Sequence, residues 1–322
     1  MPASTRSWQE SFAPTRLAAW RLVIVVAGEA LVDLVVAGPS ITASPGGAPY
    51  NVARAVGRLG EPVALLAGIS LDVFGRMLAA GLEDAGVDTG LLQRGARPTT
   101  LAVAQLDVDG AANYTFYVAG TSAPAVTDVA WPTSATTLVT GGLGLVLTPL
   151  ADTIEALVEQ APAETLVVVD VNCRPGAIED PPRYRQRLAR MAARADVVKA
   201  SDEDLDYLAL TTSPVDSARA LLDLGAGAVL VTAGAGVTTV VTREGTRDVP
   251  VPPVTVVDTI GAGDAFTAGF VTWWLAQAHD RSHLADLDAL SGAVTAAHAV
   301  AAVVVTRRGA DPPSREDLPP PW

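Results

Sequence analysis

The sequence has very little of the chemistry that disulfides, zinc sites and lysine-dependent mechanisms require. Cys173 is the only cysteine, so no disulfide can form within the chain. The three histidines, His279, His283 and His298, form no zinc-ligand spacing with it. Lys199 is the only lysine, so a mechanism that needs one has a single candidate. These shortages exclude a disulfide or zinc scaffold and fit a reducing cytoplasm.

Positive charge and uninterrupted apolar runs are scarce as well. The net charge is −13, and an acidic chain repels phosphate backbones, so we expect no nucleic-acid partner. The run Leu22–Gly38 is interrupted by Glu29 and Asp33, and Ala293–Val305 is too short for a membrane span. We expect Ala293–Val305 to be a buried helix that runs into a strand. Residues 1–20 lack the pattern of a signal peptide and are expected to be a frayed extension. The sequence therefore predicts no membrane association.

Apolar residues make up 49% of the chain and aromatic ones only 5%, with Ala, Val, Leu and Gly dominant. Apolar β-branched runs alternate with segments of helical spacing, which is typical of βαβ units. We therefore predict an α/β fold with a mostly parallel central sheet, flanked by helices in three layers. The expected strands are 21–27, 63–67, 166–171, 197–199 and 228–232, and the expected helices are 50–59, 74–85, 183–194, 218–224 and 265–277.

Two segments depart from this alternation. Residues 31–44 follow the first strand without a helix, and residues 97–120 read as two strands joined by a turn at Asp107–Gly110. They predict a small β lid on the main domain, although a pair of extra edge strands would give the same pattern. The expected organisation is an extension at 1–20, one domain at 21–310 and a proline-rich surface tail at 311–322.

The most informative segment is Val257–Phe266 (VDTIGAGDAF), where a glycine turn precedes an apolar helix. Small residues let the amides of Gly261, Ala262 and Gly263 point at one place, and the helix N-terminus adds positive potential, so an anion is expected there. Asp264 would repel a resting phosphate, but it fits a base that takes a proton from an attacking hydroxyl. The alternative is that Asp264 only caps the helix. The segment is neither a P-loop nor a dinucleotide-binding fingerprint.

Asp258–Phe270 resembles the C-terminal signature of the PfkB/ribokinase-like carbohydrate kinases, and Pro45–Gly60 resembles their N-terminal signature. The resemblance implies a ribokinase-like fold and ATP-dependent phosphorylation of a sugar hydroxyl with Mg²⁺. It assigns the role of catalytic base to Asp264 and the anion hole to Gly261, Ala262 and Gly263. The two signatures lie far apart and in the family's order, so the resemblance extends over nearly the whole chain.

The substrate side of the site is predicted around the first strand and the glycine pair. Gly46 and Gly47 let the backbone approach a ligand closely, and Asn51 can donate and accept toward a hydroxyl pair. Asp33 follows a strand end, where ligands bind in open α/β sheets. A glycine hinge, a helix-capping asparagine and a solvated loop acid are the alternatives. The resemblance assigns sugar binding to Asp33, Gly46, Gly47, Asn51 and Arg97.

The segments Gly28–Asp33 (GEALVD) and Gly46–Asn51 (GGAPYN) are similar to the fructokinase branch of the family. Ribokinases usually carry a lysine where Ala48 stands, which disfavours ribose. D-Fructose is therefore the leading substrate. The alternatives are 2-keto-3-deoxygluconate, ribose or a nucleoside and, from another class, an inactive sugar or nucleotide sensor.

The nucleotide side is predicted from several strand ends. Arg174 ends a segment that resembles the family's Asp-x-Asn-x-Arg element and can grip phosphate bidentately. The family's Asn-x-x-Glu motif is altered, because Ser201 replaces Asn and Asp204 replaces Glu, so Glu203 and Asp204 stay unranked as ligands of Mg²⁺ through water. The residues assigned to ATP are Asn172, Arg174, Ser201, Thr232, Gly234, Gly236 and His298, the last as an adenine contact or a packing residue.

Two further expectations follow from the resemblance. Asp258, Ile260, Val304, Arg307 and Gly309 match positions that hold a monovalent cation in K⁺-activated members, mostly through backbone oxygens. A β lid with exposed edges also invites pairing with a second copy. K⁺ dependence and a homodimer through the lid are therefore hypotheses from the sequence.

Overall fold

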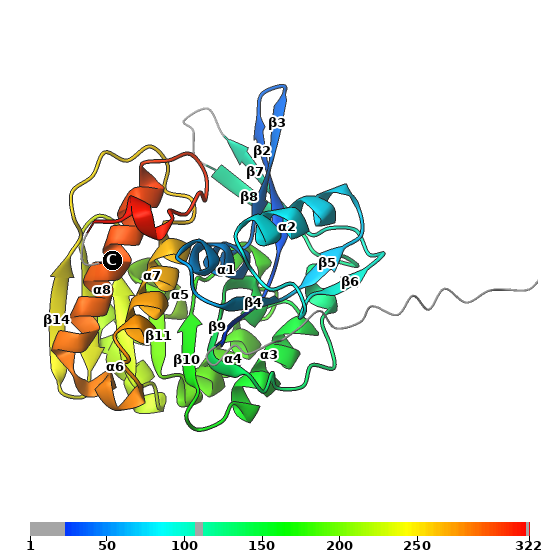
Figure 1. Ribbon diagram of the computed structural model, residues 1–322. Helices are drawn as coiled ribbons and strands as arrows, with labels where there is room; N and C mark the ends of the chain where they lie inside the picture. Colours follow the sequence, from blue (N-terminus) through cyan, green and yellow to red (C-terminus); the bar gives the residue numbers. More distant parts are fainter. Residues whose placement is uncertain (1–22, 107–111, 320–321) are drawn as a thin grey trace, which may run out of the picture.

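A computed structural model describes residues 23–106, 112–319 and 322, and its centre is an eight-stranded sheet (Figure 1). The strand order is β14-β13-β12-β11-β10-β9-β1-β4. All neighbours from β4 to β12 are parallel, and β13 and β14 add an antiparallel edge. The strands are β1 (Val23–Ala27), β4 (Val63–Leu66), β9 (Ala135–Gly141), β10 (Leu166–Asp170), β11 (Val197–Ser201), β12 (Ala228–Thr232), β13 (Val237–Thr242) and β14 (Gly245–Pro250).

Eight α-helices among the described residues cover the two faces of this sheet (Figure 1). Two hydrophobic clusters, one on each face, join the helices to the sheet. The predicted three-layer α/β class is confirmed. One face carries α1 (Ala48–Arg58), α2 (Val73–Asp84), α7 (Ala262–Ala276) and α8 (Leu287–Val305), and the other carries α3 (Leu150–Gln160), α4 (Pro181–Arg194), α5 (Asp202–Leu208) and α6 (Pro214–Leu224).

Helix α8 corrects one expectation. Residues 293–305 do not run from helix into strand, because α8 continues to Val305. Its alanines and valines suit a buried helix as well as a strand, and length decides between the two. Within the described ranges, α8 is the one helix long and apolar enough to cross a membrane, yet it packs against α7, β13 and β14. It is therefore placed as a core helix.

A second sheet forms the lid and stands at the top of Figure 1. Its order is β3-β2-β7-β8, from β2 (Leu31–Ala37), β3 (Ser40–Gly46), β7 (Leu101–Leu106) and β8 (Ala112–Tyr117). These strands come from the two segments that interrupt the βαβ alternation. The expected turn at Asp107–Gly110 and the expected extension at 1–20 lie outside the described residues. A short pair, β5 (Gly68–Ser70) and β6 (Gln93–Gly95), flanks the core.

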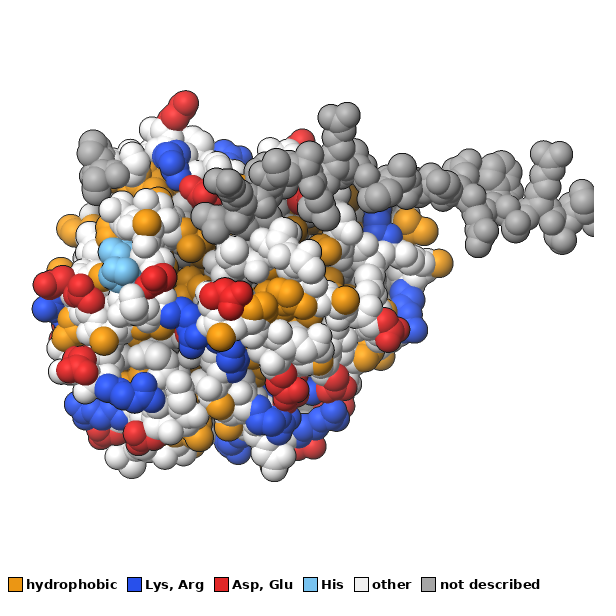
Figure 2. Space-filling model, turned by 60° about the horizontal axis from the view of Figure 1, so that its bottom comes forward, with side chains coloured by type: hydrophobic (Ala, Val, Ile, Leu, Met, Phe, Trp, Pro, Cys, Tyr) orange, Lys and Arg blue, Asp and Glu red, His pale blue; other side chains and the backbone are white. Residues whose placement is uncertain are grey.

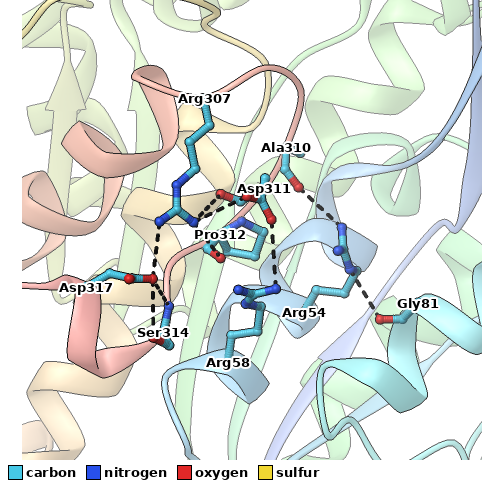
Figure 3. A network of polar contacts seen from close by, with 9 residues as sticks. All are labelled: Arg54, Arg58, Gly81, Arg307, Ala310, Asp311, Pro312, Ser314 and Asp317. Carbon is cyan, nitrogen blue, oxygen red and sulfur yellow. Dashed lines mark hydrogen bonds and ion pairs between the residues drawn. The ribbon is translucent and has the colours of Figure 1, made fainter.

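The end of the chain differs from the surface tail that the sequence suggests. Pro312, Pro313 and Leu318 are buried, and Leu318 packs in a cluster with Leu59, which follows α1, and with Val304 of α8. Two arginines of α1 and one that follows α8 hold this segment in place (Figure 3). Arg307 donates to the carbonyl of Pro312 (3.4 Å) and to Asp317 (3.2 Å), Arg54 donates to Ala310 O (3.2 Å), and Arg58 pairs with Asp311 (3.8 Å).

The face in Figure 2 carries basic side chains interspersed with acidic ones. Such a surface, on a chain of net charge −13, offers no broad positive field on the side that the figure shows.

Candidate active site

A cavity of about 590 Å³ lies where the lid meets the carboxyl ends of the parallel strands. Ligands bind at this edge in open α/β sheets, because the loops after the strands converge there. The lid contributes apolar and acidic walls, and the loops contribute the glycine turn and several polar groups. Prominent lining residues are Glu29, Asp33, Asn51, Ala102, Tyr114, Phe116, Asn172, Arg174, Gly261, Gly263 and Asp264.

The glycine turn of the predicted anion hole opens α7. Gly261 is the N-cap in a left-handed conformation (φ 79°) and supplies no side-chain hydrogen bond. The amide of Ala262 donates to the carbonyl of Thr259 (3.2 Å), whereas the amide of Gly263 has no side-chain acceptor and can face an anion. A Cβ on Gly261 would lie 2.6 Å from Cβ of Ala310, so the turn also needs glycine for space. Asp264 is the third residue of α7 and does not cap it, which removes the capping alternative.

Asp264 and Asn51 form the central contact of the cavity. Nδ2 of Asn51 donates to Oδ2 of Asp264 at 2.8 Å, and Oδ1 of Asn51 is buried without a partner among the described residues. Burial raises the pKa of Asp264 to about 6, while the hydrogen bond from Asn51 opposes the rise. The charge of Asp170 also raises this pKa, whereas Lys199 and Arg174 lower it. A carboxylate with this pKa is ionised at neutral pH and basic enough to take a proton.

Asp33 enters the cavity from the lid strand β2. Gly46 on β3 leaves room for this carboxylate, because a Cβ there would lie 1.9 Å from Oδ2 of Asp33 and would displace it. Burial raises the pKa of Asp33 to about 6, and the charge of Arg174 counteracts part of that rise. Gly47 is the N-cap of α1 with φ 101°, a conformation that favours glycine. The glycine pair therefore serves both the lid carboxylate and the start of α1.

Glu29 is a site residue that the sequence analysis treats only as an interruption of an apolar run. It is 2% exposed, and its two oxygens accept from the amides of Ala48 (3.1 Å) and Gly144 (2.9 Å). Burial raises its pKa to about 7. The carboxyl group ties the start of α1 to the loop after β9. The sequence signal that could have identified Glu29 as a site residue is an acid that follows an apolar strand closely and interrupts the apolar run.

Lys199 and Asp170 form a second group that the sequence analysis leaves unassigned. Nζ of Lys199 donates to both oxygens of Asp170, at 2.8 and 2.9 Å, and both side chains are buried. The hydroxyl of Thr267 in α7 also donates to Asp170 (2.9 Å). Lys199 stands out in the sequence as the only lysine, but its position beneath α7 is evident only from the structure.

The residues expected near phosphate divide into two groups. Asn172, with φ 37°, and Arg174 line the cavity itself. Arg174 counteracts the pKa rise at Glu29, Asp33 and Asp264, so its charge acts on the sugar side as well. Thr232, Gly234 and Gly236 lie instead at the end of β12 and in the turn to β13, where Thr232 is the register partner of Ser201.

The structure distinguishes the two acids proposed for Mg²⁺. Asp204 forms a capping box with Ser201 and accepts from the amides of Ser201 (2.8 Å) and Cys173 (2.6 Å), so both oxygens are occupied. Glu203 is exposed. Within residues 23–106 and 112–319, no three acidic, histidine or cysteine side chains cluster as a metal site. These groups suit a cation held mainly by phosphate oxygens and water.

His298 is buried in α8 rather than presented to a ligand. It is 5% exposed, its Nε2 lies 2.8 Å from Oγ1 of Thr238, and its ring lies 5.5 Å from that of Phe266. Burial lowers its pKa, which keeps the imidazole neutral. These contacts favour a packing role for His298 over a contact with adenine.

The residues matched to a monovalent-cation site lie partly together. Asp258 accepts from the amides of Ile260 (3.0 Å) and Gly309 (2.8 Å), which joins the two loops. The carbonyl of Val304 accepts from the amide of Arg307 (2.9 Å), and the Arg307 side chain turns to the C-terminal segment.

Arg97 is not brought to the main cavity. It lines a separate cavity of about 510 Å³, together with residues from the starts of α3 and α4. The assignment of Arg97 to the sugar therefore has no geometric support within this conformation.

The fold and the site together define an α/β enzyme whose ligand cavity lies between a parallel sheet and a β lid. Residues 20–317 match the pfkB family carbohydrate kinases, and the chain belongs to that family. A fructokinase from Rhizobium leguminosarum bv. trifolii is 38% identical over 257 residues, which cover 77% of this chain and 78% of that protein.

Two solved structures extend the comparison. The Xylella fastidiosa fructokinase with bound ATP is 30% identical, with a TM-score of 0.82, covering 92% of this chain and 95% of that one. A double mutant of the Vibrio cholerae O395 fructokinase, with fructose, ADP and potassium ion, is 27% identical. Its TM-score is 0.79, with 90% and 94% of the two chains covered. The resemblance inferred from the two signatures is confirmed.

Proposed function

We propose that the protein transfers the γ-phosphoryl group of ATP to the 6-hydroxyl of D-fructose. The observation that carries the proposal is the position of Asp264, beside the uncapped start of α7 and hydrogen-bonded to Asn51 within one cavity. The fructokinases similar to this chain support the choice of sugar, and the bound ATP of the Xylella enzyme supports the donor.

In the proposed reaction, the carboxylate of Asp264 takes the proton of the sugar hydroxyl. The hydroxyl oxygen attacks the γ-phosphorus, the bond from that phosphorus to the β,γ-bridging oxygen breaks, and ADP leaves. The amides of the Gly261–Gly263 turn stabilise the charge on the transferring group. Asp33 and the buried Oδ1 of Asn51 accept hydrogen bonds from hydroxyl groups of the sugar. Tyr114 and Phe116 shield the cavity from water.

The cavity favours a neutral sugar over a sugar acid. Glu29, Asp33 and Asp264 line it, against the single cavity-lining arginine Arg174 among the described residues. A carboxylate on the substrate would meet Asp33 and Asp264, which are mostly ionised at neutral pH, and like charges at short range in a buried site repel strongly. This balance supports D-fructose over 2-keto-3-deoxygluconate.

Mg²⁺ bound with the nucleotide would offset the negative charge of the phosphates. We assign Glu203, which is exposed, as the acid that would bind the water molecules around this ion. Asp204 is assigned to the α5 cap instead. Asn172, Arg174, Ser201, Thr232, Gly234 and Gly236 are proposed for ATP. Asp258, Ile260, Val304, Arg307 and Gly309 are proposed for a monovalent cation, for which the potassium ion of the Vibrio structure gives support.

We also propose a cytoplasmic homodimer paired through the lid. Ile41 and Tyr117 are large apolar residues exposed on the two edge strands of the lid sheet, and exposed apolar groups on a sheet edge favour pairing. Sedimentation at several concentrations tests this: the wild type should be dimeric and an Ile41→Lys variant monomeric. A monomeric wild type would contradict the proposal.

ATP-dependent ADP release tests the function itself, across D-fructose, 2-keto-3-deoxygluconate, ribose and nucleosides. Fructose should give the highest kcat/KM. Asp264→Asn should lower kcat by at least about 10³-fold, with the thermal midpoint and nucleotide binding preserved, because base and charge are lost together. Near-normal turnover of that variant would remove Asp264 as the base. Silence of the wild type on every acceptor, with ATP still binding, would favour the sensor.

A further inference from the structure

We propose that Lys199 is an electrostatic positioning residue for phosphoryl transfer, which holds a fixed positive charge behind the anion-hole turn. The inference rests on the proposed kinase function and adds to it a residue that does not line the cavity. Lys199 is 6% exposed, so it reaches the reaction through α7 rather than by touching substrate.

The sheet register brings the charge to this place. Lys199 of β11 and Asp170 of β10 are paired in register at the carboxyl ends of adjacent parallel strands. Side chains of paired residues lie on the same face of a sheet. Here that is the face covered by α7, as the contact of Asp170 with Thr267 requires.

The ammonium lies directly against the start of α7. A Cβ built on Gly263 would be 3.1 Å from Nζ of Lys199, so glycine at this position permits the approach. The hydroxyl of Thr267 bridges Asp170 (2.9 Å) and the carbonyl of Gly263 (3.1 Å). Lysine is thus next to the first turn of α7, and the carboxylate of Asp170 is anchored one turn further on.

This arrangement adds to the field of the helix start. The amides of the turn already carry partial positive charge toward the cavity. The ammonium end of the Lys199–Asp170 pair lies against this turn. The dipole of the pair therefore strengthens that potential in a buried site and needs no reorganisation during the reaction. On Asp264 the two charges of the pair act in opposite directions, since Asp170 raises its pKa and Lys199 lowers it. The inference therefore rests on the position of the ammonium next to the turn.

Stability alone is a weak explanation for the ion pair. Buried pairs can often be replaced by neutral residues of similar shape at little cost, because the desolvation penalty offsets their attraction. Removing both charges together should therefore leave the fold intact and expose any effect on the reaction.

The test compares Lys199→Met/Asp170→Asn and Lys199→Arg with the wild type. The double variant should lose about 10- to 100-fold in kcat, a smaller loss than for a direct oxyanion donor. Its KM for fructose should stay within about 2-fold, since the charge acts on the transition state. Lys199→Arg keeps the charge and should retain more kcat than the double variant.

Several outcomes would overturn the inference. One is a folded double variant with wild-type kcat, and another is a folded Lys199→Arg variant as slow as the double variant. If the double variant does not fold, Thr267→Val decides, because it releases the pair from α7: lower kcat at constant KM supports the role, and unchanged kcat overturns it. A wild type without kinase activity on any acceptor would instead overturn the proposed function.

Discussion

At the scale of single residues, the contact between Asn51 and Asp264 sets the protonation of the proposed base. Burial pushes the pKa of Asp264 up, and the amide of Asn51 holds it down by donating to the charged form. The balance leaves the carboxyl ionised above about pH 6. Activity should therefore be lost on the acid side as this group takes up a proton.

Asn51→Ala should move the acid limb of the kcat–pH profile upward, because losing the donor raises the pKa of Asp264 further. The measurement is kcat for fructose as a function of pH. Tyr50→Phe is the matched control, since it removes a buried hydrogen bond from the same helix, to Leu78 O at 3.2 Å, without touching Asp264. An acid limb that stays in place in Asn51→Ala would show that the two groups are uncoupled.

The sequence could predict most of this site at the level of residue type. The spacing around Asp264 indicated an anion turn and a base, and the glycine pair before α1 indicated close approach. It could not predict that Asn51 donates to Asp264, because that contact joins residues from opposite ends of the chain. Glu29 and Lys199 were missed for the same reason, since their partners come from other strands and loops.

At the scale of elements, helix α1 is held at both ends, and this fixes where Asn51 lies. Glu29 accepts from the amide of Ala48 at its start. Near its end, Gly57 packs so closely that a Cβ would lie 2.2 Å from the carbonyl oxygen of Ala85. A backbone oxygen cannot turn aside as a side chain can, so α1 itself would have to move.

Gly57→Ala should therefore destabilise the protein, although alanine favours helix by about 1 kcal/mol over glycine. Overpacking against backbone costs about 1–3 kcal/mol and outweighs that gain. Urea unfolding measures the difference. The control is Gly95→Ala, where no atom lies within 4 Å of the added Cβ and stability should hardly change. A Gly57→Ala variant more stable than the wild type would contradict this packing.

The helices and strands differed in how well the sequence predicted them. Strands such as β10 and β12 are short, valine-rich runs that are mainly apolar, and they were predicted almost to the residue. Strand β9, next to β1 in the sheet, was missed because the threonines of Ala135–Gly141 interrupt the apolar run that marks a buried strand, although threonine itself favours strands. The helix α3 that follows was missed with it. Periodicity identified elements whose side chains carry the signal, and tertiary pairing determined the others.

At the scale of the whole molecule, the C-terminal segment closes the back of the site. It covers Leu59 and Val304, and Ala310 packs against Gly261 of the anion turn. The arginine contacts of Figure 3 hold it to α1 and to the residues that follow α8.

Deletion of residues 311–322 should lower the thermal midpoint by several degrees, since it exposes an apolar cluster and leaves Arg307 without its acceptors. Fructose phosphorylation should fall as well. Calorimetry and the ADP assay measure both effects. Arg315→Ala is the control, because it removes only the partly exposed pair with Glu61, worth about 0–1 kcal/mol. An unchanged midpoint on deletion would mean that the segment is not part of the core.

The contact between Asn51 and Asp264 also has a consequence for the order in which the enzyme folds. The two residues are 213 positions apart, and β1 completes the sheet only by inserting between β4 and the later strand β9. Contacts of such long range are slow to form, because the entropy of closing the intervening loop is lost first. On dilution from denaturant, local helices should therefore return early, and catalytic competence should be among the last properties to recover.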